Sequence, residues 1–237
     1  MAVFAGPEIV ESGLVLSLDA GNTKSYSGIG ITVYNLVSST IYPSVNLFGD
    51  TSYGSISNGV VNISGASNNT SSGVFLRGLG SLGSTINDDF TTIGWLYRTS
   101  SGTDEVMSYR ESSYRCTFAV SDSAMVFNQR ETVSPYTNNV TSVSVTNNLN
   151  TWYCYALSKS GNSWSFYHNG SLVGTNTFTM TQTIVGNAFH IGLAYSDDDY
   201  ISNGMNGSVG PIMHYTRALT ASEVQQNFNA TRGRFNI

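Results

Sequence analysis

Hydrophobic and polar residues alternate in short segments along most of the chain, with turn-forming residues between the segments. In residues 90–98, the alternation places Ile93, Trp95 and Tyr97 on one face. A period of two is typical of a β-strand. The pattern therefore predicts an all-β protein, with strands at 13–19, 59–64, 73–77, 90–98, 105–110, 114–120, 124–130, 152–159, 163–168, 171–175, 189–195 and 208–216.

Two segments are more informative than the rest. Residues 152–159 are apolar on both faces, which indicates a central strand that is covered on both sides. Asn169-Gly170 separates two predicted strands, and this dipeptide favours a type I′ hairpin turn. We also expect Trp95, Trp152 and Trp164 to be buried in the core.

One helix is predicted near the C-terminus, at about 220–232. Residues 220–223 read TASE, a capping box in which the Thr220 hydroxyl and the Glu223 carboxylate each accept a backbone N–H. Val224 and Phe228 share one side at helical spacing, and Gly233 is the expected stop. The predicted fold class is therefore all-β: a two-sheet antiparallel β-sandwich of jelly-roll type with one short C-terminal helix.

Composition narrows the class of protein. The 237 residues fit one sandwich domain, and only 11% of them are charged. A net charge of −5 without a basic cluster argues against nucleic acid as a partner. No apolar run is long enough to span a membrane, and residues 1–10 lack the basic start of a signal peptide. Cys116 and Cys154 lie in apolar strands, where we expect free buried thiols.

Several segments resemble one family. Residues 14–22 (LVLSLDAGN), 166–174 (FYHNGSLVG) and 215–223 (YTRALTASE) are similar to the concanavalin A-like lectin/glucanase domains of the laminin-G type. The resemblance implies a concanavalin A-like sandwich over residues 13–237, preceded by an N-terminal arm at 1–12. Residues 32–57 depart from the family pattern, so no function is transferred to that stretch.

The opening segment and residues 227–235 (NFNATRGRF) resemble the versions of this domain in virion proteins of tailed phages, including phages of cyanobacteria and other marine bacteria. This resemblance implies a non-enzymatic virion surface protein, either a capsid decoration or a small tail knob, assembled in the host cytoplasm. Its partners would be capsid or tail proteins, host-surface glycans and other copies of the chain. The alternatives are a carbohydrate-binding lectin or adhesin module and, last, a glycoside hydrolase.

The chain lacks the acidic pattern of a glycosidase on this fold. Such enzymes place two carboxyl groups about 5–5.5 Å apart in the retaining mechanism. On one strand the two acids must therefore be spaced to share a face. Asp104 and Glu105 are neighbours and point to opposite faces, and no other glutamate has a suitably spaced acid. We therefore predict that the protein is not an enzyme. We expect His168, His190 and His214 to be strand-surface or core residues.

An acidic triplet is the first candidate binding site. Asp197, Asp198 and Asp199 lie in a predicted loop, flanked by Tyr195 and Tyr200 and followed by Asn203. Three interpretations are open: a solvated loop, a calcium site through Asp197 and Asp199, or direct contact with a glycan or protein. Calcium takes six to eight oxygen ligands, which this composition supplies. It is the one cofactor that the sequence suggests.

Tyr109, Arg110, Tyr114 and Arg115 form a second candidate, an exposed turn between two predicted strands. Tyrosine and arginine are common anchors of binding interfaces. The alternative is that they are ordinary residues at the end of a hairpin.

Residues 1–11 are the third candidate. Gly6-Pro7 favours an extended turn, and Val3, Phe4, Ile9 and Val10 are apolar. We expect an attachment arm that adds a strand to a neighbouring sheet edge. The competing interpretation is that this segment folds back over its own domain.

Overall fold

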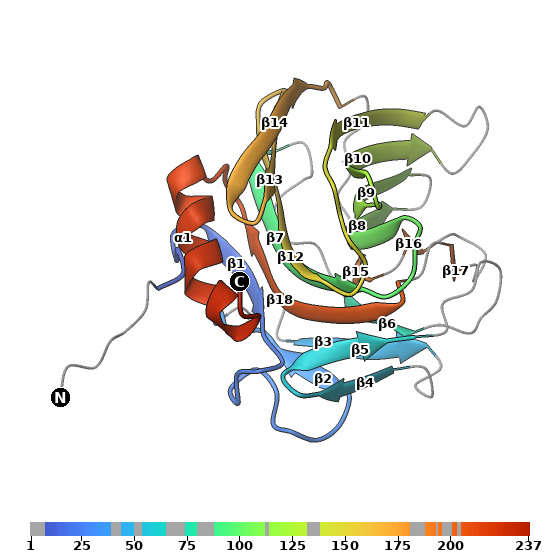
Figure 1. The fold of residues 1–237 in the computed structure, drawn as a ribbon, viewed down its shortest axis with the longest axis vertical. Helices are drawn as coiled ribbons and strands as arrows, with labels where there is room; N and C mark the ends of the chain where they lie inside the picture. The colour runs from blue at the N-terminus through green and yellow to red at the C-terminus, as the bar shows by residue number, and fades with distance from the viewer. Residues whose placement is uncertain are drawn as a thin grey trace.

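The structure is a computed structural model, which describes residues 8–38, 44–49, 54–64, 74–79, 88–111, 114–131, 138–180, 188–192, 194–195, 201–202 and 205–237. Two eight-stranded antiparallel sheets pack as a sandwich, and one helix lies outside them (Figure 1). The predicted fold class is confirmed. We call the sheet that carries the helix the back sheet and the other the front sheet.

The back sheet contains both ends of the domain. Its strands are β1 (Leu14–Leu18), β4 (Gly54–Ser57), β5 (Val60–Ile63), β7 (Phe90–Arg98), β12 (Trp152–Ser160), β13 (Ser163–His168), β14 (Ser171–Thr177) and β18 (Gly207–Tyr215). They are ordered β14-β13-β12-β7-β18-β5-β4, and β1 also pairs with β18. β12 is central, between β13 and β7, and is buried on both faces over much of its length, as predicted for 152–159.

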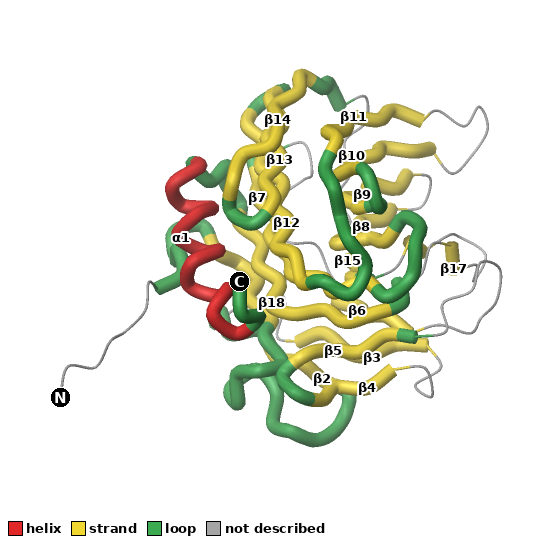
Figure 2. Tube along the Cα trace, in the orientation of Figure 1, coloured by secondary structure: helices red, strands yellow, loops and turns green. Residues whose placement is uncertain are grey.

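The front sheet is built from the middle of the chain. Its strands are β2 (Thr32–Tyr34), β3 (Ser44–Gly49), β6 (Val74–Leu79), β8 (Asp104–Glu111), β9 (Tyr114–Val120), β10 (Ala124–Glu131), β11 (Asn138–Ser144) and β15 (Ala188–Ile191). Their order is β11-β10-β9-β8-β15-β6-β3-β2. The predicted strand 189–195 is divided into β15 and β16 (Ala194–Tyr195), and β16 pairs with β17 (Ile201–Ser202). Figure 2 shows how strands dominate the molecule.

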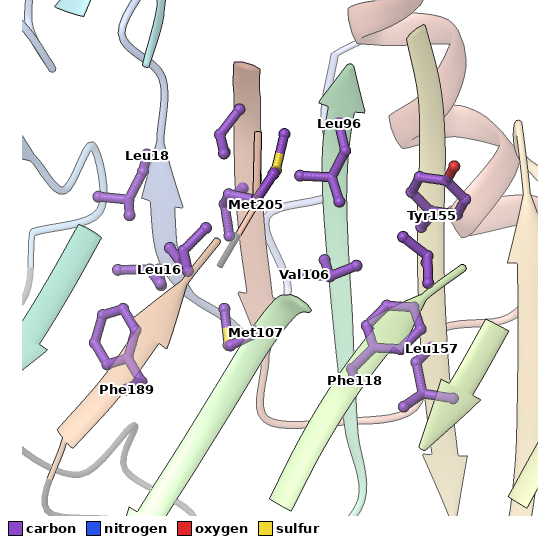
Figure 3. Packing of buried hydrophobic residues seen from close by; sticks show 14 of the residues in the cluster. Leu16, Leu18, Leu96, Val106, Met107, Phe118, Tyr155, Leu157, Phe189 and Met205 are labelled. Carbon is purple, nitrogen blue, oxygen red and sulfur yellow. The ribbon is translucent and has the colours of Figure 1, made fainter. Parts of the chain in front are cut away.

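The main core lies between the two sheets (Figure 3). Side chains from both sheets meet there, including Leu16 and Leu96 from the back sheet and Met107 and Phe118 from the front sheet. Alternation along β7 sends Leu96 into this core and Trp95 to the opposite face, where a second apolar cluster forms under the helix. Both faces of the back sheet therefore bury apolar side chains.

The helix α1 (Ala221–Thr231) begins at the predicted capping box. The Thr220 hydroxyl accepts the Glu223 N–H, and the Glu223 carboxylate accepts the Thr220 N–H. Phe228 stacks on Trp95 with ring centroids 5.6 Å apart. The α-helix ends at Thr231 with Arg232 as its C-cap, close to the predicted end at about 232, and the chain continues through a 3-10 turn, η2 (Arg232–Arg234), after which Phe235 stacks on Trp95. Among the described residues, no helix is long and apolar enough to cross a membrane.

The segment before β1 differs from the predicted arm. Val10 is buried, its N–H donates to Asn227 Oδ1 at 2.8 Å, and its carbonyl accepts the Tyr215 hydroxyl at 2.9 Å. Ile9 packs on the same cluster. Residues 8–11 therefore fold back over the domain, because their apolar side chains are covered by the helix and the back sheet. Val3 and Phe4 lie outside the described residues.

Two local predictions are confirmed. Asn169 and Gly170 both have positive φ, of 49° and 76°, in the turn between β13 and β14. A side chain at Gly170 would collide with Phe228, since its Cβ would lie 2.9 Å from that ring. Cys116 and Cys154 are free and buried, in the inter-sheet core and in the cluster under the helix respectively.

Candidate functional site: an aromatic groove on the back sheet

A row of side chains crosses the outer face of the back sheet, from β12 to β5. In the strand register, Trp152 pairs with Tyr97, Tyr97 with Ser208, and Ser208 with Asn62. Directly paired residues lie on the same face of a sheet, so the four side chains form one continuous row. The row is aromatic at one end and polar at the other.

The polar end of the row is held by hydrogen bonds. The Ser208 hydroxyl donates to Asn62 Oδ1 at 2.8 Å. The amide of Asn62 in turn donates to the Ser57 hydroxyl at 3.0 Å. These bonds fix the orientation of the amide and the hydroxyls before any ligand arrives, which lowers the entropic cost of binding.

The C-terminal segment covers one side of the aromatic end. Phe235 lies between two indoles, with centroids 4.3 Å from Trp95 and 4.4 Å from Trp152. Tyr97 and Trp152 are tilted rings 5.5 Å apart. Trp95 is fully buried, whereas Tyr97, Trp152 and Phe235 are half-buried. Trp95 and Trp164 are fully buried as expected, whereas Trp152 is only partly buried and packs at the edge of the cluster under the helix.

Arg234 fixes this segment to the domain. Its guanidinium forms an ion pair with Asp19 and donates to the carbonyl of Gly59 at 2.8 Å. Gly21 makes room for it, because a Cβ at that position would lie 2.0 Å from Nη2 of Arg234. The pairing leaves the local charge balanced, so the site favours a neutral ligand.

Two adjoining pockets result. The first, about 290 Å³, is lined by Asn58, Val60, Tyr97, Trp152, Ser208, Arg234 and Phe235; we call it the aromatic groove. The second, about 400 Å³, is lined by Ala20, Gly21, Thr23, Tyr26, Ser27, Gly28, Ile56, Ser57, Asn58 and Gly59; we call it the polar pocket. Asn58, in the left-handed conformation of the β4–β5 turn, lines both.

The predicted acidic loop lies almost entirely outside the described residues. Asp197, Asp198, Asp199, Tyr200 and Asn203 lie outside the described residues, and only the backbone of Tyr195 is described, in β16. The calcium site and the loop contact therefore stay predictions.

Strand alternation places the residues of the second predicted site, at the turn between β8 and β9, on opposite faces of the front sheet. Tyr109 faces the interior, where its hydroxyl lies 3.2 Å from Nδ1 of His214 and contacts Met107. It is therefore not an exposed anchor. Arg110 pairs with Arg115 in the strand register, and both positions belong to the outer face of the front sheet. Tyr114 pairs with Glu111 and Glu131 at the end of the same sheet.

Asp104 and Glu105 point to opposite faces, as their adjacency predicted. Asp104 faces inward and forms an ion pair with the buried Arg98. Glu105 lies on the outer face of the front sheet, where burial raises its pKa to about 8 although Arg115 nearby lowers it. At neutral pH this carboxyl group is mostly protonated.

His214 is a core residue. It lies between the sheets, within 2.8 Å of the Thr92 hydroxyl, and burial lowers its pKa to about 3. Its imidazole is therefore neutral over the physiological pH range and does not act as a pH sensor.

The comparison with protein families decides the classification. Residues 68–225 match the Laminin_G_3 family model, described as the concanavalin A-like lectin/glucanases superfamily. The chain belongs to this superfamily. No curated protein matches the chain closely enough to count as a relative.

Solved structures of similar fold match more than nine-tenths of the chain at low sequence identity. Domain 4 of AbnA, a GH43 extracellular arabinanase from Geobacillus stearothermophilus solved with arabinotriose, is 14% identical with a TM-score of 0.64, covering 93% of this chain and 100% of that one. The binding domain of botulinum neurotoxin serotype D/C is 9% identical with a TM-score of 0.62, and the match covers 92% and 52%.

The Trypanosoma rangeli sialidase is 15% identical with a TM-score of 0.61, covering 93% of this chain and 33% of the sialidase. The chain thus spans the whole of the arabinanase domain, but about half of the neurotoxin domain and a third of the sialidase. At these identities the similarity establishes the fold.

Proposed function

We propose that this protein is a non-catalytic glycan-binding module that holds a sugar ring in the aromatic groove. The proposal rests on the row Trp152–Tyr97–Ser208–Asn62. In this row two aromatic rings lie next to a hydroxyl and an amide group whose orientations are fixed by a hydrogen bond. A pyranose or furanose presents the matching pattern, an apolar face of C–H groups bordered by hydroxyls.

The dimensions of the site agree with this ligand class. Ligand pockets in proteins run from about 300 to 1,000 Å³ and combine apolar walls with a few placed polar groups. The aromatic groove, at about 290 Å³, has room for one sugar ring, and the adjoining polar pocket for more of the chain. Proteins of the same fold have been solved with arabinotriose and with sialyllactose, which supports a sugar as the ligand.

We propose that the module performs no hydrolysis. Glycoside hydrolysis requires two carboxyl groups across the scissile bond. Among the described strand residues of the front sheet, Glu105 is the one acid whose register position lies on the outer face. In the groove, the nearby acid Asp19 is engaged by Arg234. A pair of carboxyl groups is therefore missing from both surfaces, as far as the described residues show.

The test is a glycan array followed by calorimetry with the best binder. We expect Tyr97→Ala to weaken binding at least tenfold, because it removes half of the aromatic platform. Tyr34→Ala is the matched control, since Tyr34 is half-exposed on the other sheet. Failure of the wild-type protein to bind any glycan, or equal binding by Tyr97→Ala, would refute the proposal.

We further propose that this module is displayed on the surface of a tailed-phage particle, bound to capsid or tail proteins. The support is the resemblance of residues 14–22 and 227–235 to phage virion proteins, together with the low fraction of charged residues. Mass spectrometry and antibody labelling of purified particles test this. Detection of the chain only in the soluble fraction of lysates would contradict it.

A further inference from the structure

The walls of the aromatic groove and the polar pocket contain one charged side chain. Of the described residues that line these two pockets, Arg234 alone carries a formal charge, and the others are aromatic, aliphatic, hydroxyl, amide or glycine residues. The net charge that a ligand meets in the groove is therefore set by Arg234 and by the acid that neutralises it.

That acid is Asp19, which lines neither pocket. Asp19 directly follows β1, and its Oδ1 forms an ion pair with Nη1 of Arg234. The other terminal nitrogen, Nη2, donates to the carbonyl of Gly59 at 2.8 Å. The side chain of Arg234 is 34% exposed and that of Asp19 is 22% exposed. A ligand in the groove therefore touches the cation, whereas Asp19 acts on the ligand through the ion pair.

The surrounding backbone holds the ion pair in one arrangement. Oδ1 of Asp19 also accepts the N–H of Gly21 at 2.9 Å, which fixes the carboxylate. The guanidinium fills space that two glycines leave, because a Cβ at Gly21 would lie 2.0 Å from Nη2 and a Cβ at Gly59 would lie 3.1 Å from it. The next residue, Phe235, stacks between two indoles. The pair is therefore part of a fixed wall, unlike a contact between two freely moving surface side chains, which contributes little.

We propose that the Asp19–Arg234 pair makes the groove selective for neutral oligosaccharides, and that Asp19 is the residue that excludes acidic ones. The inference rests on the proposed function, since it names the class of glycan for the same groove. A guanidinium without a partner binds a carboxylate through two parallel hydrogen bonds, so Arg234 alone would favour a uronic acid. Asp19 occupies this guanidinium, cancels its charge and repels a second carboxylate placed beside it. Other N–H groups of the guanidinium can still donate to sugar hydroxyls.

The test compares neutral trisaccharides with their acidic counterparts. Cellotriose, galactotriose and mannotriose are printed on an array, each beside the tri-uronate of the same linkage, which differs by a carboxylate at C6 of every ring. We expect the wild type to bind a neutral member more tightly than its acidic counterpart, and calorimetry on that pair gives the two affinities.

Asp19→Asn is the decisive variant. Asparagine keeps the size of the side chain and an oxygen that can accept the N–H of Gly21, but it leaves the charge of Arg234 uncompensated. The affinity for the acidic trisaccharide should therefore rise about fivefold or more, and added salt should reduce this gain. The affinity for the neutral trisaccharide should stay close to that of the wild type, because the aromatic and hydroxyl contacts are unchanged.

Further variants separate the ion pair from a general effect of charge. Asp19→Asn/Arg234→Gln removes both charges and should lose the gain in acidic binding. Glu11→Gln is the matched control, because Glu11 is an exposed acid that precedes β1 and lines neither pocket; it should leave the ratio of the two affinities unchanged. Thermal unfolding shows whether each variant is folded. If Asp19→Asn is not folded, Asp19→Ser, which also keeps an acceptor, replaces it.

Three results would overturn the inference: a wild type that prefers the acidic member, an unchanged ratio of affinities in Asp19→Asn, or an equal gain in Glu11→Gln. In each of these cases the wild type still binds a glycan, so the proposed function is left to the Tyr97→Ala test. Absence of wild-type binding to all the printed trisaccharides would also count against the inference, whereas the proposed function falls only if a full glycan array is negative as well.

Discussion

The two outer faces of the sandwich have opposite chemistry. On the back sheet the outward positions include Trp95, Cys154 and Ala156, and they are covered by α1 and Phe235. On the front sheet the outward positions include the buried Ser108 and Thr117 and the half-buried Arg115, and the helix lies on the other side of the molecule (Figure 1). Both sheets supply the same inter-sheet core, so the chemical difference between the two faces comes from their outward residues.

We expect the largest loss of stability from substitutions on the outer face of the back sheet, under the helix. Trp95 is fully buried and stacks on Phe228 and Phe235, so Trp95→Ala should lower the free energy of unfolding by about 3–5 kcal/mol. Trp152→Ala should cost clearly less, because its ring is half-buried at the edge of the groove. Urea unfolding of both variants measures the difference. Equal losses would contradict the distinction between core and groove.

The front sheet should show a pH-dependent effect, which comes from the buried Glu105. Burial raises the pKa of Glu105 from 4.5 to about 8, so the folded state holds a proton that the unfolded state releases. Stability should therefore fall as pH rises from about 4.5 to 8, by up to about 4 kcal/mol from this group. Glu105→Gln should remove that fall. His214 and the other titrating groups remain in both proteins, so the difference between the two curves isolates Glu105; parallel curves would be evidence against the assignment.

The smallest effect concerns the attachment of the helix. Thr220→Ala removes the side-chain half of the capping box and should cost about 1 kcal/mol. Thr220→Ser keeps the hydroxyl and serves as the control. If Thr220→Ala lowered the free energy of unfolding more than Trp152→Ala does, the cap would have to stabilise a larger part of the protein than the end of the helix.

Much of the fold was readable from alternation and turn residues. The β-class, the central strand 152–159, the Asn169-Gly170 hairpin and the capped helix all follow from local patterns that agree with the tertiary structure. Strands β2, β3, β4 and β11 were missed because their patterns are short or polar. β11 is an edge strand that buries Thr141 and exposes Val140, which reverses the expected alternation.

The binding surfaces were harder to predict, because each is assembled from distant strands. The aromatic groove joins residue 58 to residues 97, 152, 208 and 235, and no local motif links them. The sequence contained one indication of the groove. Trp95 and Tyr97 share a face of β7, and Tyr97 lies nearer the end of the strand, beyond the part that the helix covers.

The glycan site is tested most directly by an NMR titration of the full chain with the glycan that binds best on the array. We expect the largest chemical-shift changes at the Trp152 indole and at the amides of Asn58, Tyr97 and Ser208, with little change on β8–β10. Shifts confined to the front sheet, or spread evenly over the molecule, would contradict the assignment of the glycan site to the aromatic groove.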